Sequence, residues 1–168
     1  MEKIPTYFEK IDMAELANKI NPNLSEQETI DIVVVILNEE AIKLVIHGKL
    51  EEAVENIAPL VEGGLEYSIL YNTLGMAYLS ANNPFRASLN FEKAIRINPN
   101  IAGIHGNLAV AYMRMKKVDP AITEFKKALK LGYKREDMFL DAIKFCEENH
   151  RYEDSSYFSG VQEGLQNP

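Results

Sequence analysis

Apolar residues recur three and four positions apart along much of the chain, which is the spacing of one face of an α-helix. The members of one such face are Leu74, Ala77 and Tyr78, and those of the next are Ala87, Phe91, Ala94 and Ile95. The polar stretch Asn82-Asn83-Pro84 separates the two faces. This pattern predicts two antiparallel helices joined by a tight turn, and such a helix pair cannot bury its apolar face alone.

The same pattern returns after 34 residues. YNTLGMAY at 71–78 becomes HGNLAVAY at 105–112, and NFEKA at 90–94 becomes EFKKA at 124–128. The equivalent pairs are Leu74 and Leu108, Tyr78 and Tyr112, Ala87 and Ala121, Phe91 and Phe125, and Ala94 and Ala128. Pro99 has no equivalent, because Tyr133 stands in the matching place. The pattern resembles the tetratricopeptide repeat, which has Leu-Gly-x2-Tyr, then Ala-x3-Phe, then Pro at this period.

The resemblance implies an all-α fold, a right-handed superhelical solenoid of antiparallel helix pairs with an N-terminal helix and C-terminal capping helices. We expect a single domain over residues 1–168. Its parts are an N-terminal helix and linker at 6–24, a degenerate repeat at 34–67, repeats at 68–101 and 102–135, and a degenerate repeat or capping helices at 136–168.

Local signals predict where the helices begin and end. Ser25 and Glu28 have capping-box spacing, so the first helix of the degenerate repeat is expected to run from about residue 25 to 47, with Gly48 ending it. The run IDIVVVIL inside it resembles a buried strand, but its helical flanks and the repeat register favour a helix. Pro59 is expected to interrupt the second helix.

Later boundaries follow from proline, glycine and serine. Gly63-Gly64 is expected to separate two helix pairs, and Pro84 and Pro120 to start helices after the capping-type residues Asn83 and Asp119. In the last unit Ser155 and Ser159 take the places of Ala87 and Phe91, which predicts weak inward packing and a polar outer face. Such a unit suits the end of a solenoid.

In this family the first helix of each pair lines a concave groove, and the resemblance carries that role to specific positions. They are Val35, Asn38, Ile42, Val45 and Ile46, then Ile69, Asn72, Met76 and Leu79, then Gly103, Gly106, Asn107, Val110, Met113 and Arg114. This surface is largely apolar and suits a peptide or helix with an apolar segment. The glycines are expected to leave room for a bulky side chain. Alternatively, the N-terminal helix or another subunit covers the groove.

Family members that clamp the acidic tails of heat-shock chaperones use paired basic residues and asparagines. Asn107 fits one such place, but Asn72 and Gly103 stand where lysine or arginine is expected, and Met76 replaces an asparagine. A clamp for two carboxylates is therefore not expected here.

Charge is unevenly distributed along the chain, whose formal net charge is -7. Residues 1–66 carry 14 acidic and 5 basic side chains, residues 67–135 carry 3 and 11, and residues 136–168 carry 8 and 2. Most central bases are expected on the convex side: Lys93, Arg96, Lys126, Lys127 and Lys130. Solvated helix faces explain this pattern, and a homo-oligomer that joins acidic ends to basic middles is the alternative.

Nothing in the sequence favours catalysis. His47, His105 and His150 are far apart, and His105 takes an aromatic packing place. Cys146 fits a small core position, and there is no metal-ligand spacing or phosphate loop, so no cofactor is expected. The charge balance argues against nucleic acid, and no stretch predicts a secretory signal or membrane insertion.

We therefore expect a cytoplasmic, non-catalytic interaction module, an adaptor, scaffold or chaperone-like protein that binds an apolar segment of a partner. A self-assembling structural scaffold is the alternative, and similarity to small secretion chaperones is a third possibility without a specific motif.

Overall fold

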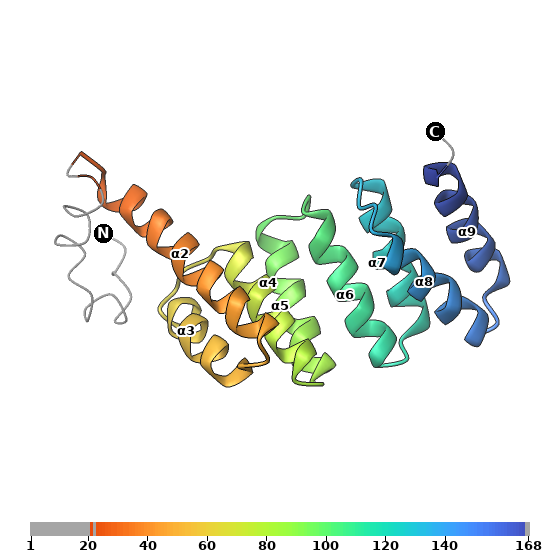
Figure 1. Ribbon diagram of the computed structural model, residues 1–168, viewed down its shortest axis with the longest axis horizontal. Helices are drawn as coiled ribbons and strands as arrows, with labels where there is room; N and C mark the ends of the chain where they lie inside the picture. Colours follow the sequence, from red (N-terminus) through yellow and green to blue (C-terminus); the bar gives the residue numbers. More distant parts are fainter. Residues whose placement is uncertain (1–20, 22, 167–168) are drawn as a thin grey trace. The chain divides into compact units, whose positions relative to one another are not determined.

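The computed structural model describes residue 21 and residues 23–166, and every regular element in that part of the chain is an α-helix (Figure 1). The helices are α2 (Glu26–Ile46), α3 (Leu50–Glu62), α4 (Ser68–Ser80), α5 (Pro84–Ile97), α6 (Ala102–Arg114), α7 (Val118–Lys130), α8 (Glu136–Glu148) and α9 (Tyr152–Gln166). The all-helical prediction is confirmed. The N-terminal helix predicted for 6–24 falls almost wholly outside the described residues.

The chain forms two compact units, which meet in the sequence at Asn83 and Pro84. The first unit contains α2, α3 and α4, and each of these helices packs against the other two. Its core is aliphatic, and its fully buried members include Val34, Ile57, Leu60 and Leu70.

The capping box at the start of α2 is confirmed. Ser25 has an extended backbone, its hydroxyl accepts a hydrogen bond from the Glu28 amide at 3.3 Å, and its own amide donates to Glu28 Oε2 at 2.8 Å. Two of the amides that a helix start leaves unpaired are thereby satisfied. At the other end Gly48 adopts a left-handed φ of 75°, and the Lys49 amide donates to the Leu44 carbonyl. IDIVVVIL is helical, as expected.

The predicted interruption at Pro59 is wrong. Pro59 lies inside α3, which continues to Glu62, and its carbonyl accepts a hydrogen bond from the Gly63 amide at 2.9 Å. Proline removes only its own amide donor, and tertiary packing of Leu60 and Ile57 holds the last turn in place. The helix ends instead at Gly63-Gly64, where Gly64 has a φ of 95°, so the predicted break between helix pairs is confirmed.

The second unit contains α5 to α9. Each helix from α5 to α9 packs against the next, and Figure 1 shows α8 and α9 side by side. Phe91, Phe125, Phe139 and Phe158 are its largest fully buried side chains. The rings of Phe125 and Phe158 meet edge to face with centroids 6.0 Å apart, which joins α9 to α7.

Two local expectations in this unit require correction. Asp119 does not cap α7, because the helix already begins at Val118 after Lys116 has turned the chain with a φ of 57°. The carbonyl of Asp119 instead accepts a hydrogen bond from Thr123 Oγ1 at 2.8 Å. Pro84, in contrast, is the first residue of α5, as expected.

Inward packing of the last unit is also stronger than expected. Ser155 is buried, and Phe158, the neighbour of Ser159, supplies the aromatic ring that contacts Phe125. The repeat register places Ser159, and not Phe158, at the position of Phe91. Because adjacent residues differ by about 100° around a helix, the register alone does not predict that Phe158 points inward.

Candidate functional site

The predicted groove positions fall in both units, on α2 and α4 in the first and on α6 in the second.

Two predicted groove residues on α2 are buried in the first unit. Asn38 Oδ1 accepts a hydrogen bond from Thr73 Oγ1 on α4 at 2.7 Å, and both side chains are buried. Val45 is buried in the aliphatic core. In this structure Asn38 and Val45 fasten α2 to its neighbours and do not present their side chains to a ligand, which corrects the expectation for these two residues.

The opposite side of α2 is apolar and exposed. Val35 is 47% exposed, Ile36 54% and Ile46 73%, whereas Ile42 and Ile32 are half-buried. We call this surface the exposed α2 face, and it consists of Ile32, Val35, Ile36, Glu39, Ile42, Lys43 and Ile46. Their spacing of three, four and seven positions places them along one side of the helix.

The predicted groove residues on α4 are all half-buried, namely Ile69, Asn72, Met76 and Leu79. Ile69 and Met76 pack against the core of the first unit, and Asn72 Nδ2 lies 3.5 Å from Met76 Sδ. Their accessible surface is smaller than that of the α2 side chains, so α2 carries the larger apolar surface of this unit.

In the second unit the space beside the α6 glycines is occupied by the chain itself. A Cβ atom on Gly106 would lie 3.0 Å from Tyr133 Cε1 and 3.5 Å from Met138 Sδ, and one on Gly103 would lie 3.7 Å from the same ring. Tyr133 stands where the repeat pattern has proline, and its amide donates to the Ala128 carbonyl at 3.0 Å. The expectation that these glycines leave room for a ligand side chain is therefore wrong.

Nearer the C-terminal end of α6 the surface is hollowed. An open hollow of about 390 Å³ is lined by Met113, Arg114, Lys116, Phe145, Glu148 and Asn149. Val110 and Asn107, about one and two turns earlier on α6, are half-buried, and Val110 packs against the core. Sequence reasoning missed the contribution of α8. The available signal was the placement of Phe139, Ala142 and Cys146 at first-helix positions, which predicts that α8 continues the surface of α6.

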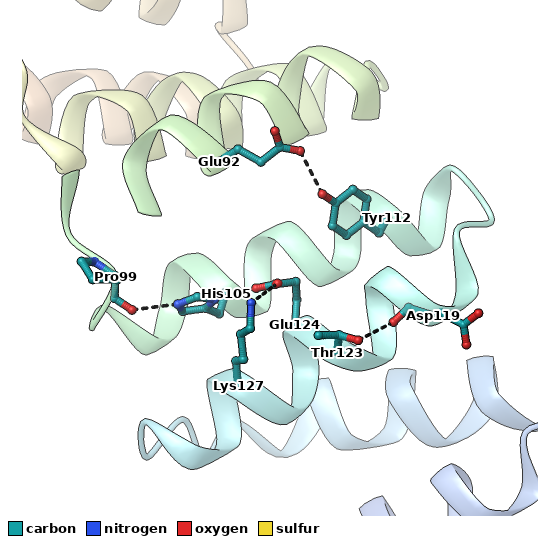
Figure 2. Close-up of polar contacts among 8 residues, drawn as sticks. All are labelled: Glu92, Pro99, His105, Tyr112, Asp119, Thr123, Glu124 and Lys127. Carbon is teal, nitrogen blue, oxygen red and sulfur yellow. Dashed lines mark hydrogen bonds and ion pairs between the residues drawn. The ribbon is translucent and has the colours of Figure 1, made fainter. Parts of the chain in front are cut away.

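A buried polar network fixes α6 against its neighbours (Figure 2). His105 Nδ1 lies 2.6 Å from Glu124 Oε2, and His105 Nε2 lies 2.8 Å from the Pro99 carbonyl. Lys127 Nζ donates to Glu124 Oε1 at 2.7 Å. His105 is thus a hydrogen-bonding position that joins α6, α7 and the α5–α6 turn, where an aromatic packing place was expected.

Tyr112 makes a second polar link, from α6 to α5. Its hydroxyl donates to Glu92 Oε1 at 2.9 Å (Figure 2). Burial and then this hydrogen bond raise the pKa of Tyr112 to about 12. The phenol therefore stays protonated at neutral pH and keeps its role as donor.

One basic residue from the middle of the chain, Lys126, forms an ion pair within the second unit. Lys126, expected on the convex side, donates to Asp154 Oδ1 on α9 at 2.6 Å and lies 5.0 Å from the centre of the Tyr157 ring. Arg151 Nη2 lies 2.8 Å from Asp154 Oδ2. The hydrogen bond from Lys126 is the main cause that lowers the pKa of Asp154. Lys126 thus fastens α9 to α7.

The described residues show little that is suited to covalent or metal chemistry. Cys146 is fully buried, and burial raises the pKa of its thiol to about 11, which disfavours the nucleophilic thiolate. Within residues 21 and 23–166, no group of three or more histidine, cysteine, aspartate or glutamate side chains is placed to hold a metal ion. No helix in this part is long and apolar enough to span a membrane.

Comparison with known sequences identifies related proteins. The tetratricopeptide-repeat family model matches residues 69–101 and 102–131. The type IV pilus assembly protein PilF of Pseudomonas aeruginosa is 31% identical over 85 residues, which cover 51% of this chain and 34% of PilF. The chain spans about a third to a half of the length of the curated relatives it matches.

Solved structures share the fold at low sequence identity. YrrB, described as a TPR protein with an unusual peptide-binding site, aligns with a TM-score of 0.67 at 15% identity over 98% of this chain and 93% of its own. The first TPR of Spaghetti (RPAP3), bound to the HSP90 peptide SRMEEVD, aligns with a TM-score of 0.64 at 16% identity over 69% of this chain and 92% of its own. The chain therefore contains two tetratricopeptide repeats, at residues 69–101 and 102–131, and it shares its fold with solved tetratricopeptide-repeat structures.

Proposed function

We propose that the protein is a non-catalytic interaction module that holds an apolar segment of a partner protein against its first helices. The exposed α2 face carries this proposal, because Val35, Ile36 and Ile46 leave aliphatic surface in water. Contiguous apolar surface of this kind typically marks an interaction site. Two fold neighbours are described as binding peptides, which supports the same kind of role.

The α6–α8 hollow is the second contact region in this proposal. Met113 and Phe145 offer apolar surface there, and Lys116 and Glu148 supply charge of both signs at its edges. A small number of polar groups around apolar surface is typical of sites that orient a ligand. The proposal places the protein in the cytoplasm as an adaptor or chaperone-like scaffold, where its single thiol stays reduced.

A quantitative pulldown with the full chain tests the proposal. The double variant Val35→Asp with Ile46→Asp should lose the proteins that the wild type enriches, because each carboxylate would be desolvated by a bound apolar segment. Leu89→Asp with Leu131→Asp is the matched control, since it adds the same two charges at exposed aliphatic side chains, 44% and 39% exposed, in the second unit. Equal enrichment by all three proteins, with equal helical content by circular dichroism, would contradict the proposal.

Self-assembly through complementary charge is a second candidate function. It is supported by the charge of the first unit, where residues 21 and 23–83 contain ten acidic and two basic side chains. Exposed charge contacts between copies weaken in salt because the Debye length falls. Size-exclusion chromatography with light scattering at low and high salt separates the candidates: a monomer at every salt concentration excludes self-assembly.

A further inference from the structure

Helix α2 carries apolar side chains on its solvent side as well as on its buried side. Val33, Val34, Ala41 and Val45 are buried against α3 and α4, whereas Val35, Ile36 and Ile46 point to solvent. A helix that is apolar all round is normally covered all round. The part of the first unit that the structure describes covers only one side of α2. The other side therefore has the composition of a contact surface.

The surroundings of this face are acidic. Glu39 is exposed in the middle of the face, and Glu28 and Asp31 are exposed at its N-terminal end. The Tyr67 hydroxyl donates to Asp31, which lowers the pKa of that carboxyl, so it remains charged at neutral pH. Carboxylates thus stand within and beside the aliphatic stripe.

Few bases offset these carboxylates. Among the described residues of the first unit the bases are Lys43 and Lys49, and each already pairs with an acid, Lys43 with Glu40 at 3.3 Å and Lys49 with Glu52 at 3.0 Å. A second copy docking through the same face would bring like charges together, since a two-fold interface repeats the same patch on both sides. Charge complementarity points instead to a basic partner.

We infer that the exposed α2 face binds a partner helix whose aliphatic side is flanked by lysine or arginine. The inference rests on the proposed function and specifies the chemistry of its partner. From Ile32 to Ile46 the face is about 21 Å long, at 1.5 Å per residue, which matches about four turns of a partner helix. Aliphatic contacts would supply the affinity, and the carboxylates would select the partner and speed its association.

Two synthetic amphipathic peptides provide the probe. Both have the same leucine face, and the polar face carries lysine in one and glutamate in the other. Fluorescence anisotropy with the full chain should show that the lysine peptide binds at least about tenfold more tightly than the glutamate peptide. Its affinity should fall severalfold when salt rises from about 0.05 to about 0.5 M, since the Debye length shrinks from more than 10 Å to less than 8 Å.

Matched variants separate the face from the general charge of the unit. Val35→Ser with Ile46→Ser removes aliphatic surface at constant charge and should abolish binding of the lysine peptide. Glu39→Lys should weaken binding by about tenfold, whereas Glu55→Lys, the same charge change on an exposed residue of α3, should weaken it much less. Circular dichroism checks that each variant keeps its helical content.

Each remaining outcome has a defined meaning. If Glu39→Lys and Glu55→Lys weaken binding equally, the attraction is one of bulk charge and the inference fails. If both peptides bind equally and the serine variant releases both, the face is a contact surface but its charge preference is refuted, and the proposed function stands. Failure of the lysine peptide to bind the full chain also overturns the inference. Binding that appears only after deletion of residues 1–20 would show that the chain's own N-terminus covers the face. A dimer that is lost in the serine variant would show that a second copy covers it, and either result overturns the inference.

Discussion

At the scale of single residues, Gly103 and Gly106 have different environments although they lie one helical turn apart. A Cβ atom on Gly103 would lie at ordinary contact distance from the Tyr133 ring, 3.7 Å, whereas one on Gly106 would lie only 3.0 Å from it. Of the two positions, only Gly106 would therefore need the ring to move if it carried a side chain. This difference makes the two glycines a matched pair for measuring how tightly Tyr133 is packed.

We expect Gly103→Ala to be neutral or to raise the free energy of unfolding by up to about 1 kcal/mol, because alanine favours helix over glycine. Gly106→Ala gains the same preference but places a methyl group 3.0 Å from Tyr133 Cε1, so it should be less stable than Gly103→Ala by about 1 kcal/mol or more. Urea unfolding measures both. In a Tyr133→Leu background the penalty at Gly106 should largely disappear, and an unchanged penalty would show that the ring is not its cause.

At the scale of elements, α9 is held to α7 by one aromatic contact and one charged cluster. Phe158 packs against Phe125, and beside it the buried carboxylate of Asp154 accepts from Lys126 and Arg151. Removing the Asp154 carboxylate would leave Lys126 and Arg151 without their acceptor. The stability of the last helix should therefore depend on pH.

The pKa of Asp154 is lower in the folded protein than its ordinary value. Its stabilising contribution is therefore complete above the unfolded pKa of about 3.9 and is lost as pH falls through the lower folded value. Asp154→Asn should reduce stability at pH 7 by about 1–2 kcal/mol and flatten this part of the acid dependence. Hydrogen exchange in α9 across pH checks this, with Glu153→Gln on the same helix turn as control. An equal acid dependence in wild type and Asp154→Asn would contradict the expectation.

At the scale of the whole molecule, the net charge of -7 is divided unequally between the two units. Residues 1–83 carry 14 acidic and 5 basic side chains, a balance of -9, and residues 84–168 carry 11 and 13, a balance of +2. Self-repulsion among like charges destabilises a compact state, and salt screens it. The two units should therefore respond differently to ionic strength.

Raising salt from about 0.05 to about 0.5 M should increase hydrogen-exchange protection in α2, α3 and α4 more than in α5 to α7. Chloride salts of sodium and potassium should act alike if screening is the cause. Glu55→Lys, at an exposed position in the middle of α3, should raise protection at low salt and reduce the salt response. A uniform response of both units would indicate that charge segregation has no effect on stability.

The features that the sequence predicted well are those carried by periodic positions. Ala87, Phe91, Ala121 and Phe125 recur at 34 residues and are all fully buried, because a repeat needs the same contact in each copy. The Ser25 capping box could be predicted equally well, since Ser25 and Glu28 lie within one helical turn of each other. Local and repeated contacts leave a pattern in one chain.

Contacts between residues that are distant in sequence and occur once leave no such pattern. The Thr73 to Asn38 hydrogen bond and the pairing of Lys126 with Asp154 join different repeats, and the Tyr133 ring packs against Gly106 from the far end of the same repeat. The groove positions of the family predicted that Asn38 and Gly103 are open to a ligand. In this chain Asn38 is hydrogen-bonded to Thr73, and the Tyr133 ring packs beside Gly103. The apolar residues of the exposed α2 face could be identified in the sequence. Which of them are exposed depends on how α3 and α4 pack against α2.

Cys146 is the single cysteine of the chain and is sealed in the core of the second unit, with a thiol pKa of about 11. A cysteine introduced on the surface would react with a maleimide far faster than Cys146, so site-specific labels can be attached without removing the native residue. The native thiol then provides an internal measure of local opening. Its slow modification reports how often α8 and α9 open, in the same sample and at the same time as any fluorescence measurement.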